Sequence, residues 1–442
     1  MIKNNKGQFL VSTRPVQWGT LEDALNISES HAVGLIRKLN ADGIEASWLN
    51  ESEKPEALGH NSNLTIFGRE LIDEGAISQM YDAMRIAPAV QGALMSDSHK
   101  GYFLPIGGVL ALENAVHPFA VGVDIACRIR LNTFDFPVDD LTDSNVASLF
   151  EVLKSVTAFG VGACFSDPHI RDHDVMFDPL WDSSPILKGL KHKARTQLGS
   201  SGGGNHHANL VRVDYLDGRS KFGLQTHSGS RATGMAVANY FTALADKETS
   251  SRYSGLPKNF GWLSLDTDAG KDYWQHMELM GRYAAANHEI IAREFMRDLG
   301  WINCDFIDHH HNFAWRENGL IVHRKGATPA HKNQMGIIAG TSGTKSYLTE
   351  GLGNFLSLES SSHGAGRVSS RKKAKEMFNE SKFVKQMSNI IYSGIAPDEG
   401  FESYKDIERV IQIQEDAGLL KVVASIQPLA VIMGGAESDD GD

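Results

Sequence analysis

The chain has 442 residues, of which 41% are hydrophobic and 22% charged, the balance of a globular protein with one large core or two to three ordinary domains. Its formal net charge of −11 excludes a protein that binds nucleic acid over its whole surface, so a site for a polyanion must be a local patch. Glycine, at 43 residues, exceeds its usual share of about 7% and predicts many tight loops with accessible backbone N–H groups.

Residues 1–58 differ in pattern from the rest of the chain and are expected to form a small helical segment. Apolar residues recur at helical spacing on either side of a short turn, so two helices are predicted. Ser28 is a suitable N-cap for the second helix and Gly43 can end it. The pair is similar to a helix-turn-helix, but six basic against eight acidic residues disfavour nucleic-acid binding, and its role stays open. Residues 53–63 follow as a linker.

The rest of the chain, residues 62–434, mixes strand and helix patterns and is expected to fold as one large α+β domain. Apolar runs bounded by glycine or charge predict strands at 104–112, 119–131, 208–216, 221–227 and 319–325. Helical periodicity predicts helices at 149–159, 271–299 and 370–387. Residues 435–442 are expected to be an acidic, solvated tail.

Cysteine use and hydropathy indicate the compartment. The three cysteines, Cys127, Cys164 and Cys304, are an odd and sparse set, which argues against a disulfide framework and indicates a reducing environment. The N-terminal stretch MIKNNKGQFLVSTRP lacks the apolar centre of a secretion signal, and no run of about 18 apolar residues occurs. We therefore expect a soluble, cytoplasmic monomer without a membrane partner.

Five short stretches carry residues that bind divalent metals well. They offer Asp124 and Cys127 in GVDIACRIR, His206 and His207 in SGGGNHHANL, His227 in LQTHSGSR, His309 to His311 in DFIDHHHNFAW, and His363. Imidazole, thiolate and carboxylate together suit Zn²⁺, Mn²⁺, Fe²⁺ or Co²⁺, and a thiolate can bridge two ions. Each stretch alone also has a structural explanation, because a lone histidine or an apolar cysteine often only packs. The small residues around four of the stretches favour a site that holds phosphate with backbone amides.

Two glycine-rich loops and several cations favour an anionic ligand. His363 lies among serines and glycines in LESSSHGAGRVSSRKK, and Arg367 opens a basic run there; alternatively, His363 is only a surface residue of this turn. The stretch GIIAGTSGTKSYL has Thr344 where a Walker loop needs its second glycine, so a P-loop ATPase is excluded. The other cations that are candidates to hold phosphate or RNA are Arg231, Arg324 and Lys325.

Taken in chain order and with their spacing, the motifs resemble those of the RtcB family of RNA ligases. The resemblance runs from about Leu64 to Gly434 and leaves out residues 1–58. It includes MSDSHKGYFLPIGGV, AVGVDIACRIRL, GGGNHHANL, HSGSR, ANHEII, HHHNFAW, VHRKGAT, GTSGTKSYL, SSHGAGRVSSR, FESYKD and QPLAVIMG. It implies one RtcB-like catalytic domain whose mixed sheets surround a cleft with two metal ions.

The resemblance implies which residues bind the metal. Two Mn²⁺ would be bound, the first by Asp124 and His206 and the second by His227 and His311. Cys127 would bridge the two ions. This choice selects one histidine from each histidine run and leaves the others without a metal role.

The resemblance also implies the reaction. His363 would attack the α-phosphate of GTP to form a histidine–GMP phosphoramidate, with Asp97 as the acidic residue near the centre. The GMP would then activate an RNA 3′-phosphate, made where necessary from a 2′,3′-cyclic phosphate, for attack by a 5′-hydroxyl. The implied partner is broken RNA and the implied role is repair. The positions that match the family's nucleotide contacts are Asn205, Asn209, Asn312, Ala339, Gly340, Thr341, Ser342, Ser346, Gly364, Ala365, Gly366, Tyr404 and Met433.

Three positions depart from the family pattern. Asn209 stands where the family has a glutamate that contacts the nucleotide, and Met433 stands where a lysine reads guanine. Ser96 stands where proline is common. A lost carboxylate and a lost cation predict weaker selection of guanine over adenine. Two alternatives to a ligase stay open, namely a metal-dependent phosphodiesterase acting on RNA ends and a non-catalytic RNA- or ribosome-binding paralogue.

Overall fold

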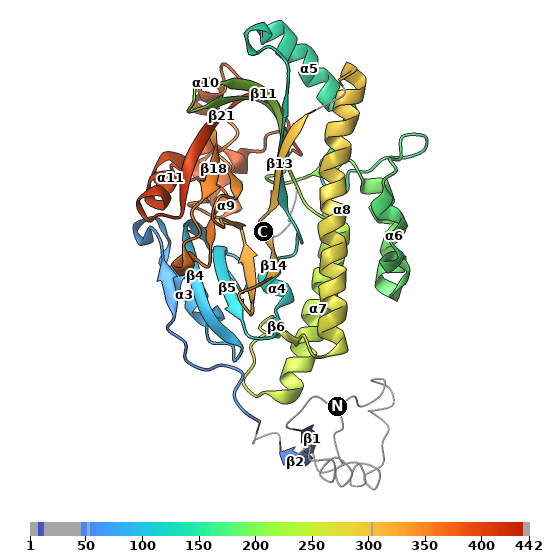
Figure 1. Ribbon diagram of the computed structural model, residues 1–442, viewed down its shortest axis with the longest axis vertical. Coiled ribbons are helices and arrows are strands. Elements are labelled where there is room, and N and C mark those ends of the chain that lie inside the picture. Colours follow the sequence, from blue (N-terminus) through green and yellow to red (C-terminus); the bar gives the residue numbers. More distant parts are fainter. Residues whose placement is uncertain (1–7, 13–45, 51–53, 302–303, 436–442) are drawn as a thin grey trace.

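The computed structural model describes residues 8–12, 46–50, 54–301 and 304–435, and its largest sheet carries many of the candidate residues (Figure 1). The strand order in this larger sheet is β13-β7-β11-β10-β21-β18-β17, and β20 pairs with β21 in parallel. Its strands are β7 (Arg128–Phe134), β10 (His207–Tyr215), β11 (Ser220–Ser228), β13 (Asp305–His310), β17 (Met335–Ile338), β18 (Ser346–Gly351), β20 (Ile391–Ser393) and β21 (Leu420–Met433).

A second, smaller sheet is formed by strands that precede Asp124 in the chain and by strands that follow His311. Its strand order is β14-β15-β5-β4-β3. Its strands are β3 (Leu64–Ile66), β4 (Ala89–His99), β5 (Ile106–Leu112), β14 (Asn312–Glu317) and β15 (Leu320–Lys325). Short strand pairs are β6 (Ala115–Val116) with β12 (Leu263–Ser264), β8 (Ala158–Phe159) with β9 (Ser200–Gly202), and β16 (Ala327–Pro329) with β19 (Ser360–Ser362).

Helices flank both sheets. They are α3 (Glu74–Ala83), α4 (Pro118–Val121), α5 (Asp143–Val156), α6 (Pro185–Gln197), α7 (Arg231–Arg252), α8 (Asp268–Leu299), α9 (Arg371–Met377), α10 (Glu380–Gln386) and α11 (Ile407–Asp416). Within the described residues, none of them is long and apolar enough to cross a membrane. Mixed helix and sheet in one large domain agree with the expected α+β class.

The long helix α8 shows how the sequence builds the core. The Thr267 side chain accepts a hydrogen bond from the Gly270 N–H at its start, and Gly300 ends it in the left-handed conformation, at φ 69°. Between these caps, apolar residues at helical spacing such as Tyr273 and Met277 are fully buried. Figure 1 shows α8 running beside α7, and the two helices share one apolar cluster with α6.

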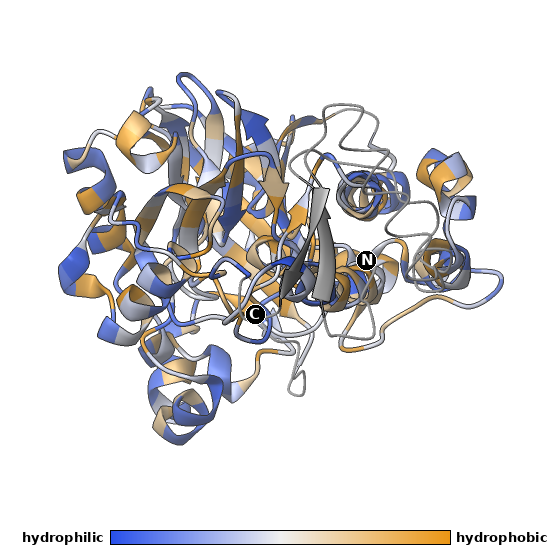
Figure 2. Cartoon of the chain, turned by 90° about the horizontal axis from the view of Figure 1, so that it is seen from below, coloured by the Kyte–Doolittle hydropathy of each residue, from blue (hydrophilic) through white to orange (hydrophobic). Residues whose placement is uncertain are grey.

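One face of the larger sheet is closed by helices, and the opposite face carries the candidate site. Leu210 of β10 and Leu224 of β11 pack with Leu153 of α5 and Phe295 of α8. Neighbouring residues of a strand point to opposite faces, so Asn209 and its row face away from these helices. Figure 2 shows hydrophobic segments gathered between the sheets and helices, with hydrophilic segments on the outside.

The segment predicted as a strand over 119–131 begins differently. Phe119 lies in the short helix α4, whose N-cap His117 accepts a hydrogen bond from the Ala120 N–H through Nδ1. Gly122 then turns the chain at φ 97°, and β7 begins only at Arg128. An apolar run cannot by itself distinguish a strand from a buried turn.

The helix predicted over 370–387 is two helices. Phe378 ends α9, and Asn379 caps α10 by accepting a hydrogen bond from the Lys382 N–H. Asparagine is among the best N-cap residues because its side chain replaces a missing backbone partner. The periodicity continues across this break, so the sequence pattern alone suggested one helix.

The predicted N-terminal helix pair lies outside the described residues. The described parts of this segment are β1 (Gln8–Ser12) and β2 (Ala46–Asn50), which pair in antiparallel fashion. Residues 54–63 form no regular strand or helix, yet they are held to the large domain. The Ala57 N–H donates to the Ser254 carbonyl over 2.9 Å, and the Ala57 side chain is fully buried.

Candidate functional site

A tight turn places two of the candidate ligands before β7. The Cys127 N–H donates to the Asp124 carbonyl over 3.1 Å, and Ala126 between them adopts φ 60°. The Ala126 N–H donates to the Asn312 carbonyl over 2.7 Å, which fixes the turn against β14. Asn312 also donates from Nδ2 to the Asp124 carbonyl and accepts from the Gly326 N–H. The turn directs the carboxylate and the thiol to the same place.

The turn meets three histidines from three other segments. The Cys127 Sγ lies 3.4 Å from His206 Nε2 and 3.2 Å from His227 Nε2. His206 Nε2 is 3.1 Å from an Asp124 carboxylate oxygen, and His227 Nε2 is 3.3 Å from His311 Nε2. The ligand atoms therefore form two triads, Asp124–Cys127–His206 and Cys127–His227–His311, which share the thiol.

The chemistry of this cluster suits metal ions. Burial, followed by the neighbouring imidazoles, holds the pKa of His227 and of His311 well below the ordinary value, so both rings are neutral and keep a lone pair for a cation. The Nδ1 atoms of His206 and His311 are buried and have no partner within the described residues. Carboxylate, thiolate and imidazole together bind borderline divalent ions. The two triads bring together the five side chains that the resemblance implied as metal ligands.

His363 lies beside the second triad. Its ring centroid is 4.8 Å from that of His311. Its Nδ1 is 2.8 Å from an Asp97 oxygen, and the same oxygen accepts from the His363 and Gly364 backbone N–H groups. When Nδ1 carries the proton for this bond, the lone pair is on Nε2. Asp97 therefore fixes both the orientation and the tautomer of His363.

The Asp97 carboxylate is fully buried and has a supporting cation. Burial alone would raise the pKa of Asp97, but the hydrogen bond and charge of His363 and the charge of Lys405 outweigh it and hold the pKa below the ordinary value. Lys405 donates to the Ser96 and Ser98 carbonyls over 3.1 and 2.6 Å, on either side of Asp97. Burial lowers the pKa of Lys405 to about 8.

Ser96, the departure noted in the sequence, is accommodated by hydrogen bonding. Its hydroxyl is fully buried and donates to the Val410 carbonyl over 3.2 Å. The same hydroxyl lies 3.4 Å from the Ser362 hydroxyl. Ser96 therefore links the strand of Asp97 to α11 and to the His363 turn.

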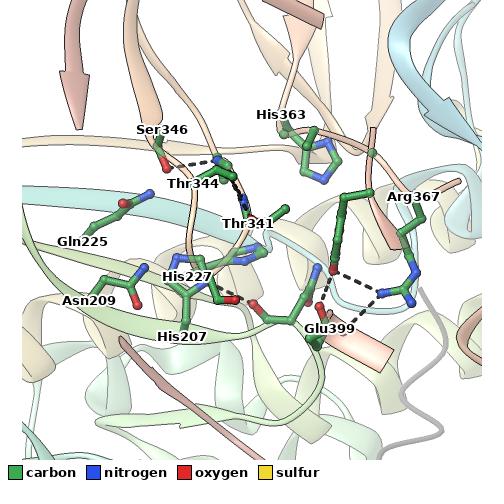
Figure 3. Close-up of a pocket in the computed structure, with 18 of the residues that line it drawn as sticks. His207, Asn209, Gln225, His227, Thr341, Thr344, Ser346, His363, Arg367 and Glu399 are labelled. Atoms are coloured by element: carbon green, nitrogen blue, oxygen red, sulfur yellow. Dashed lines mark hydrogen bonds and ion pairs between the residues drawn. The ribbon is translucent and has the colours of Figure 1, made fainter. Parts of the chain in front are cut away.

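One pocket joins His363, Cys127, His227 and His311 to every residue that the sequence predicted to contact the nucleotide. The Gly340 N–H donates to the Ser346 hydroxyl over 3.0 Å, and the Ser342 hydroxyl is buried without a partner within the described residues. Figure 3 shows Asn209 and Gln225 together on one side of this pocket and Arg367 with Glu399 on the other.

The predicted cations differ in position. Arg367 lines the pocket, where Nη1 contacts the Tyr404 hydroxyl over 3.1 Å and Glu399 over 3.3 Å. Arg231 is buried near His206 and, within the described part of the chain, forms no ion pair; its Nε donates to the Ser200 hydroxyl. Of the four predicted cations, Arg231, Arg324 and Lys325 do not line the pocket.

Lys325 and Arg324 have protein partners instead. Lys325 Nζ donates to the Tyr102 carbonyl over 2.8 Å. Arg324 is fully buried and donates from both terminal nitrogens to Glu317, at 2.9 and 2.8 Å. The structure does not bring Arg324 to the pocket, because the Glu317 carboxylate and the Ser360 hydroxyl already bind its guanidinium.

Comparison with known proteins identifies the family. Residues 79–184 and 179–434 match the family model described as "tRNA-splicing ligase RtcB". The chain is 30% identical over 372 residues to an "RNA-splicing ligase RtcB" of Escherichia coli, covering 77% of this chain and 90% of that protein. The chain belongs to the RtcB family. It is also 29% identical to a "tRNA-splicing ligase RtcB" of Nanoarchaeum equitans, over 77% of this chain and 87% of the relative. It is 27% identical to an "RNA-splicing ligase RtcB homolog 1" of Entamoeba histolytica, over 88% and 91% of the two chains.

Several pocket residues of this RtcB protein were not predicted from its sequence. His99, Gln225 and Glu399 line the pocket, and Lys405 supports Asp97 from outside it. Gln225 had a usable signal, because it precedes His227 by two residues on a predicted strand and so shares its face. His99 ends strand β4, for which no strand was predicted, while Glu399 lies in a 3-10 segment and Lys405 in the loop before α11, where no periodicity indicates direction.

Proposed function

We propose that the protein is an RNA ligase that joins RNA 2′,3′-cyclic phosphate or 3′-phosphate ends to 5′-hydroxyl ends through a nucleotidylated histidine. The observation that carries this proposal is the position of His363, which Asp97 orients at the edge of the buried Cys127–His227–His311 triad, in the same pocket as the predicted nucleotide contacts. The names of the family relatives support ligation of RNA rather than of another polymer.

The first step uses His363 as a nucleophile. Its Nδ1 proton stays in the hydrogen bond to Asp97, so the Nε2 lone pair attacks the α-phosphorus of a nucleoside triphosphate. The new bond joins nitrogen to phosphorus, the bond from the α-phosphorus to its bridging oxygen breaks, and pyrophosphate leaves. Asp97 stabilises the positive charge that develops on the ring, as the aspartate of a Ser-His-Asp triad does. Family resemblance makes GTP the expected donor.

The metal ligands are proposed as the sequence indicated them. Asp124 and His206 would hold one Mn²⁺, His227 and His311 the other, and the Cys127 thiolate would bridge them. When bound, such ions neutralise negative charge that builds on phosphate oxygens. The Asp124–Cys127 turn and the surrounding strands hold these five side chains close together.

The RNA steps return His363 to its starting state. Water first opens a 2′,3′-cyclic phosphate to a 3′-phosphate. An oxygen of that phosphate attacks the phosphorus on His363, the nitrogen–phosphorus bond breaks, and the nucleotide is transferred to the RNA end. The 5′-hydroxyl of the second RNA then attacks the 3′-phosphate, and the nucleoside monophosphate leaves. Arg367 at the pocket wall and Arg231 beside His206 are proposed to hold the anionic groups in these steps.

Labelling tests the proposal directly. The purified chain is incubated with Mn²⁺ and α-labelled GTP or ATP, and then with RNA that carries a 2′,3′-cyclic phosphate or a 3′-phosphate and RNA that carries a 5′-hydroxyl. We expect a covalent, acid-labile label on the protein and a joined RNA product. Hydrolysis of the cyclic phosphate without any label or joining would instead indicate a phosphodiesterase. Absence of both activities from folded, Mn²⁺-loaded protein would favour a non-catalytic paralogue.

A further inference from the structure

We propose that Asn209 and Gln225 recognise the base of the nucleotide donor and that they select adenine, so that the chain takes ATP in preference to GTP. This inference rests on the proposed nucleotidylation of His363 and specifies the nucleotide used there. The carboxamides belong to neighbouring strands of the larger sheet and line the pocket that contains His363. They lie on the opposite side of that pocket from Arg367 and Glu399 (Figure 3).

Strand pairing places these residues side by side on one face of the larger sheet, which forms the floor of the pocket. Asn209 of β10 pairs with Gln225 of β11 and with Val431 of β21. The next row on the same face, two residues along each strand, consists of His207, His227 and Met433. His227 belongs to the Cys127–His227–His311 triad, so Asn209 and Gln225 lie in the row next to the proposed metal site, two residues along each strand.

Both carboxamides are buried, and each presents a polar atom without a hydrogen-bond partner in the described part of the chain. The exposed fraction is 7% for Asn209 and 1% for Gln225. The Asn209 Oδ1 and the Gln225 Nε2 have no hydrogen-bond partner within the described residues. Buried polar atoms in native proteins almost always have a partner, and two adjacent ones facing a pocket indicate that a ligand supplies it. The Asn209 Oδ1 atom is an acceptor and the Gln225 Nε2 atom is a donor.

Adenine matches this pair. Its amino group donates beside a ring nitrogen that accepts, which is the pattern that Asn and Gln side chains read in a bidentate manner. Guanine can also set its N1–H donor and O6 acceptor against this pair, but its pairing edge carries a third group, the 2-amino donor. One acceptor and one donor satisfy the whole pairing edge of adenine, whereas the guanine 2-amino group would need the carboxylate that Asn209 replaces. Arg367 and Glu399, the arginine and the carboxylate that line the pocket, lie on its opposite side and contact each other.

The pocket surface beside the two carboxamides is apolar and can pack against a purine ring. Val431 and Met433 come from β21 next to this floor, and Pro428 also lines the pocket. The Met433 thioether can pack against a purine face but cannot donate to the guanine O6 atom. Cytosine also places a donor beside an acceptor, but its single ring would leave this apolar wall in contact with water.

Equilibrium binding tests the inference apart from the chemistry. The full-length His363→Ala chain, which cannot form the covalent bond, is titrated calorimetrically with ATP, GTP and CTP in the presence of Mn²⁺. We expect ATP to bind about tenfold more tightly than GTP, the effect of one well-placed hydrogen bond. The unaltered chain, given equal labelled ATP and GTP, should take up mainly AMP. Equal binding of ATP and GTP, or tighter binding of GTP or CTP, would overturn the inference.

Two substitutions locate the selection. Asn209→Asp keeps the shape but turns the carboxamide into an acceptor for both guanine N–H groups, so the ATP preference should fall about tenfold. Gln225→Glu removes the donor and should weaken ATP binding to a similar degree. Gln197→Glu is the control, because Gln197 is also buried with an unpartnered oxygen but does not line the pocket. The ratio of ATP to GTP affinity should not change in Gln197→Glu. An equal change in all three variants would contradict recognition of the base by Asn209 and Gln225.

The outcomes separate this inference from the proposed function. Covalent labelling by GTP alone would leave the ligase proposal intact and defeat the choice of adenine. Failure of every triphosphate to bind or label the folded chain would defeat both. Since the unaltered chain already gives the ATP-to-GTP ratio, the inference can be decided even if a substituted chain does not fold.

Discussion

His363 is the residue on which the proposed chemistry depends, and its surroundings explain how a histidine in a glycine-rich turn can be a nucleophile. One Asp97 oxygen accepts from the His363 ring and from two successive backbone N–H groups. Three donors on one oxygen hold the turn and the ring to the same carboxylate, so rotation of the ring would cost it the bond to Asp97. A mobile surface histidine would lose that orientation.

Substitution of the nucleophile gives the first prediction. His363→Ala should reduce covalent labelling to less than about one thousandth, because no other group replaces the nitrogen nucleophile. Bound Mn²⁺, measured by elemental analysis, should be unchanged, since neither triad includes His363. His192→Ala, in the exposed surface of α6, is the control and should label normally. Retained label in the His363→Ala chain would disprove its role.

Cys127 is the one residue common to both triads and gives the second prediction. Cys127→Ser keeps a similar volume but replaces a thiolate with a hydroxyl, a much poorer ligand for borderline ions. We expect Mn²⁺ affinity at both sites to fall about tenfold or more. The exposed Cys164 offers a control, and Cys164→Ser should bind Mn²⁺ normally. Loss of only one ion in the Cys127→Ser chain would contradict a bridging thiolate.

At the scale of elements, strands β10, β11 and β21 decide which residues share the pocket. Their registers place His207, His227 and Met433 in one row and Asn209, Gln225 and Val431 in the next. A slip of one residue in any of these pairings would turn the row towards the helices. The apolar residues on the other face, such as Leu210 and Leu224, prevent that slip because they must stay buried against α5 and α8.

Met433 on β21 gives the third prediction. Met433→Lys adds a donor that the guanine O6 atom can use, so label transfer from GTP relative to ATP should rise about tenfold. The measurement is competition between equal amounts of the two labelled nucleotides in Mn²⁺. Met335→Lys, on β17 and outside the pocket lining, should leave the ratio unchanged. An unaltered ratio in Met433→Lys would show that this position does not govern the base.

The turn after His363 gives the fourth prediction. Gly366 has φ 76°, and a Cβ there would lie 1.9 Å from the Asp97 carbonyl oxygen. Gly366→Ala should therefore lower the free energy of unfolding by about 3 kcal/mol and disturb the His363–Asp97 contact. Gly418→Ala is the matched control, because Gly418 has φ 65° but open space around it, and it should cost about 1 kcal/mol. Thermal unfolding measures both variants. If Gly366→Ala and Gly418→Ala lower the free energy of unfolding equally, the positive φ alone causes the loss and the contact with Asp97 does not contribute.

At the scale of the whole molecule, the site is a junction between the two sheets. The Asp124–Cys127 turn leads into the larger sheet, while Asn312, which holds that turn, begins a strand of the smaller one. Asp97 and the β16–β19 pair bring the His363 turn to the same junction. Any change that shifts one sheet against the other should therefore change metal binding and nucleotidylation together.

The N-terminal segment gives the fifth prediction. Residues 1–58 lie outside the motifs of the site, so removing them should spare nucleotidylation. Removal of residues 1–53 alone should leave stability unchanged, whereas removal of 1–58 also deletes the buried Ala57 and its bond to Ser254, at a cost of about 1–2 kcal/mol. Labelling and thermal unfolding of both truncated chains check this. Loss of label from a folded truncated chain would place the segment in the active machinery.

Much of the fold could be predicted because the strands and helices carry their periodicity in the sequence. The predicted strands at 208–216 and 221–227 agree with β10 and β11, and the helix predicted at 271–299 agrees with α8. The misplaced start of β7 has a physical cause, since Gly122 and Ala126 take positive φ angles that hydropathy cannot reveal. The break between α9 and α10 depends on one capping side chain, Asn379.

The sequence by itself determined the kinds of chemical group and their order along the chain: the carboxylate and thiol three residues apart, the histidines at strand ends and the small residues around His363. Only the tertiary structure decided which of these groups meet. It joined His206, His227 and His311 to Cys127, and it placed Arg324 in an ion pair with Glu317 rather than at the pocket. The physical reason is that strand register and inter-sheet packing arise from contacts between distant segments, which local patterns do not encode.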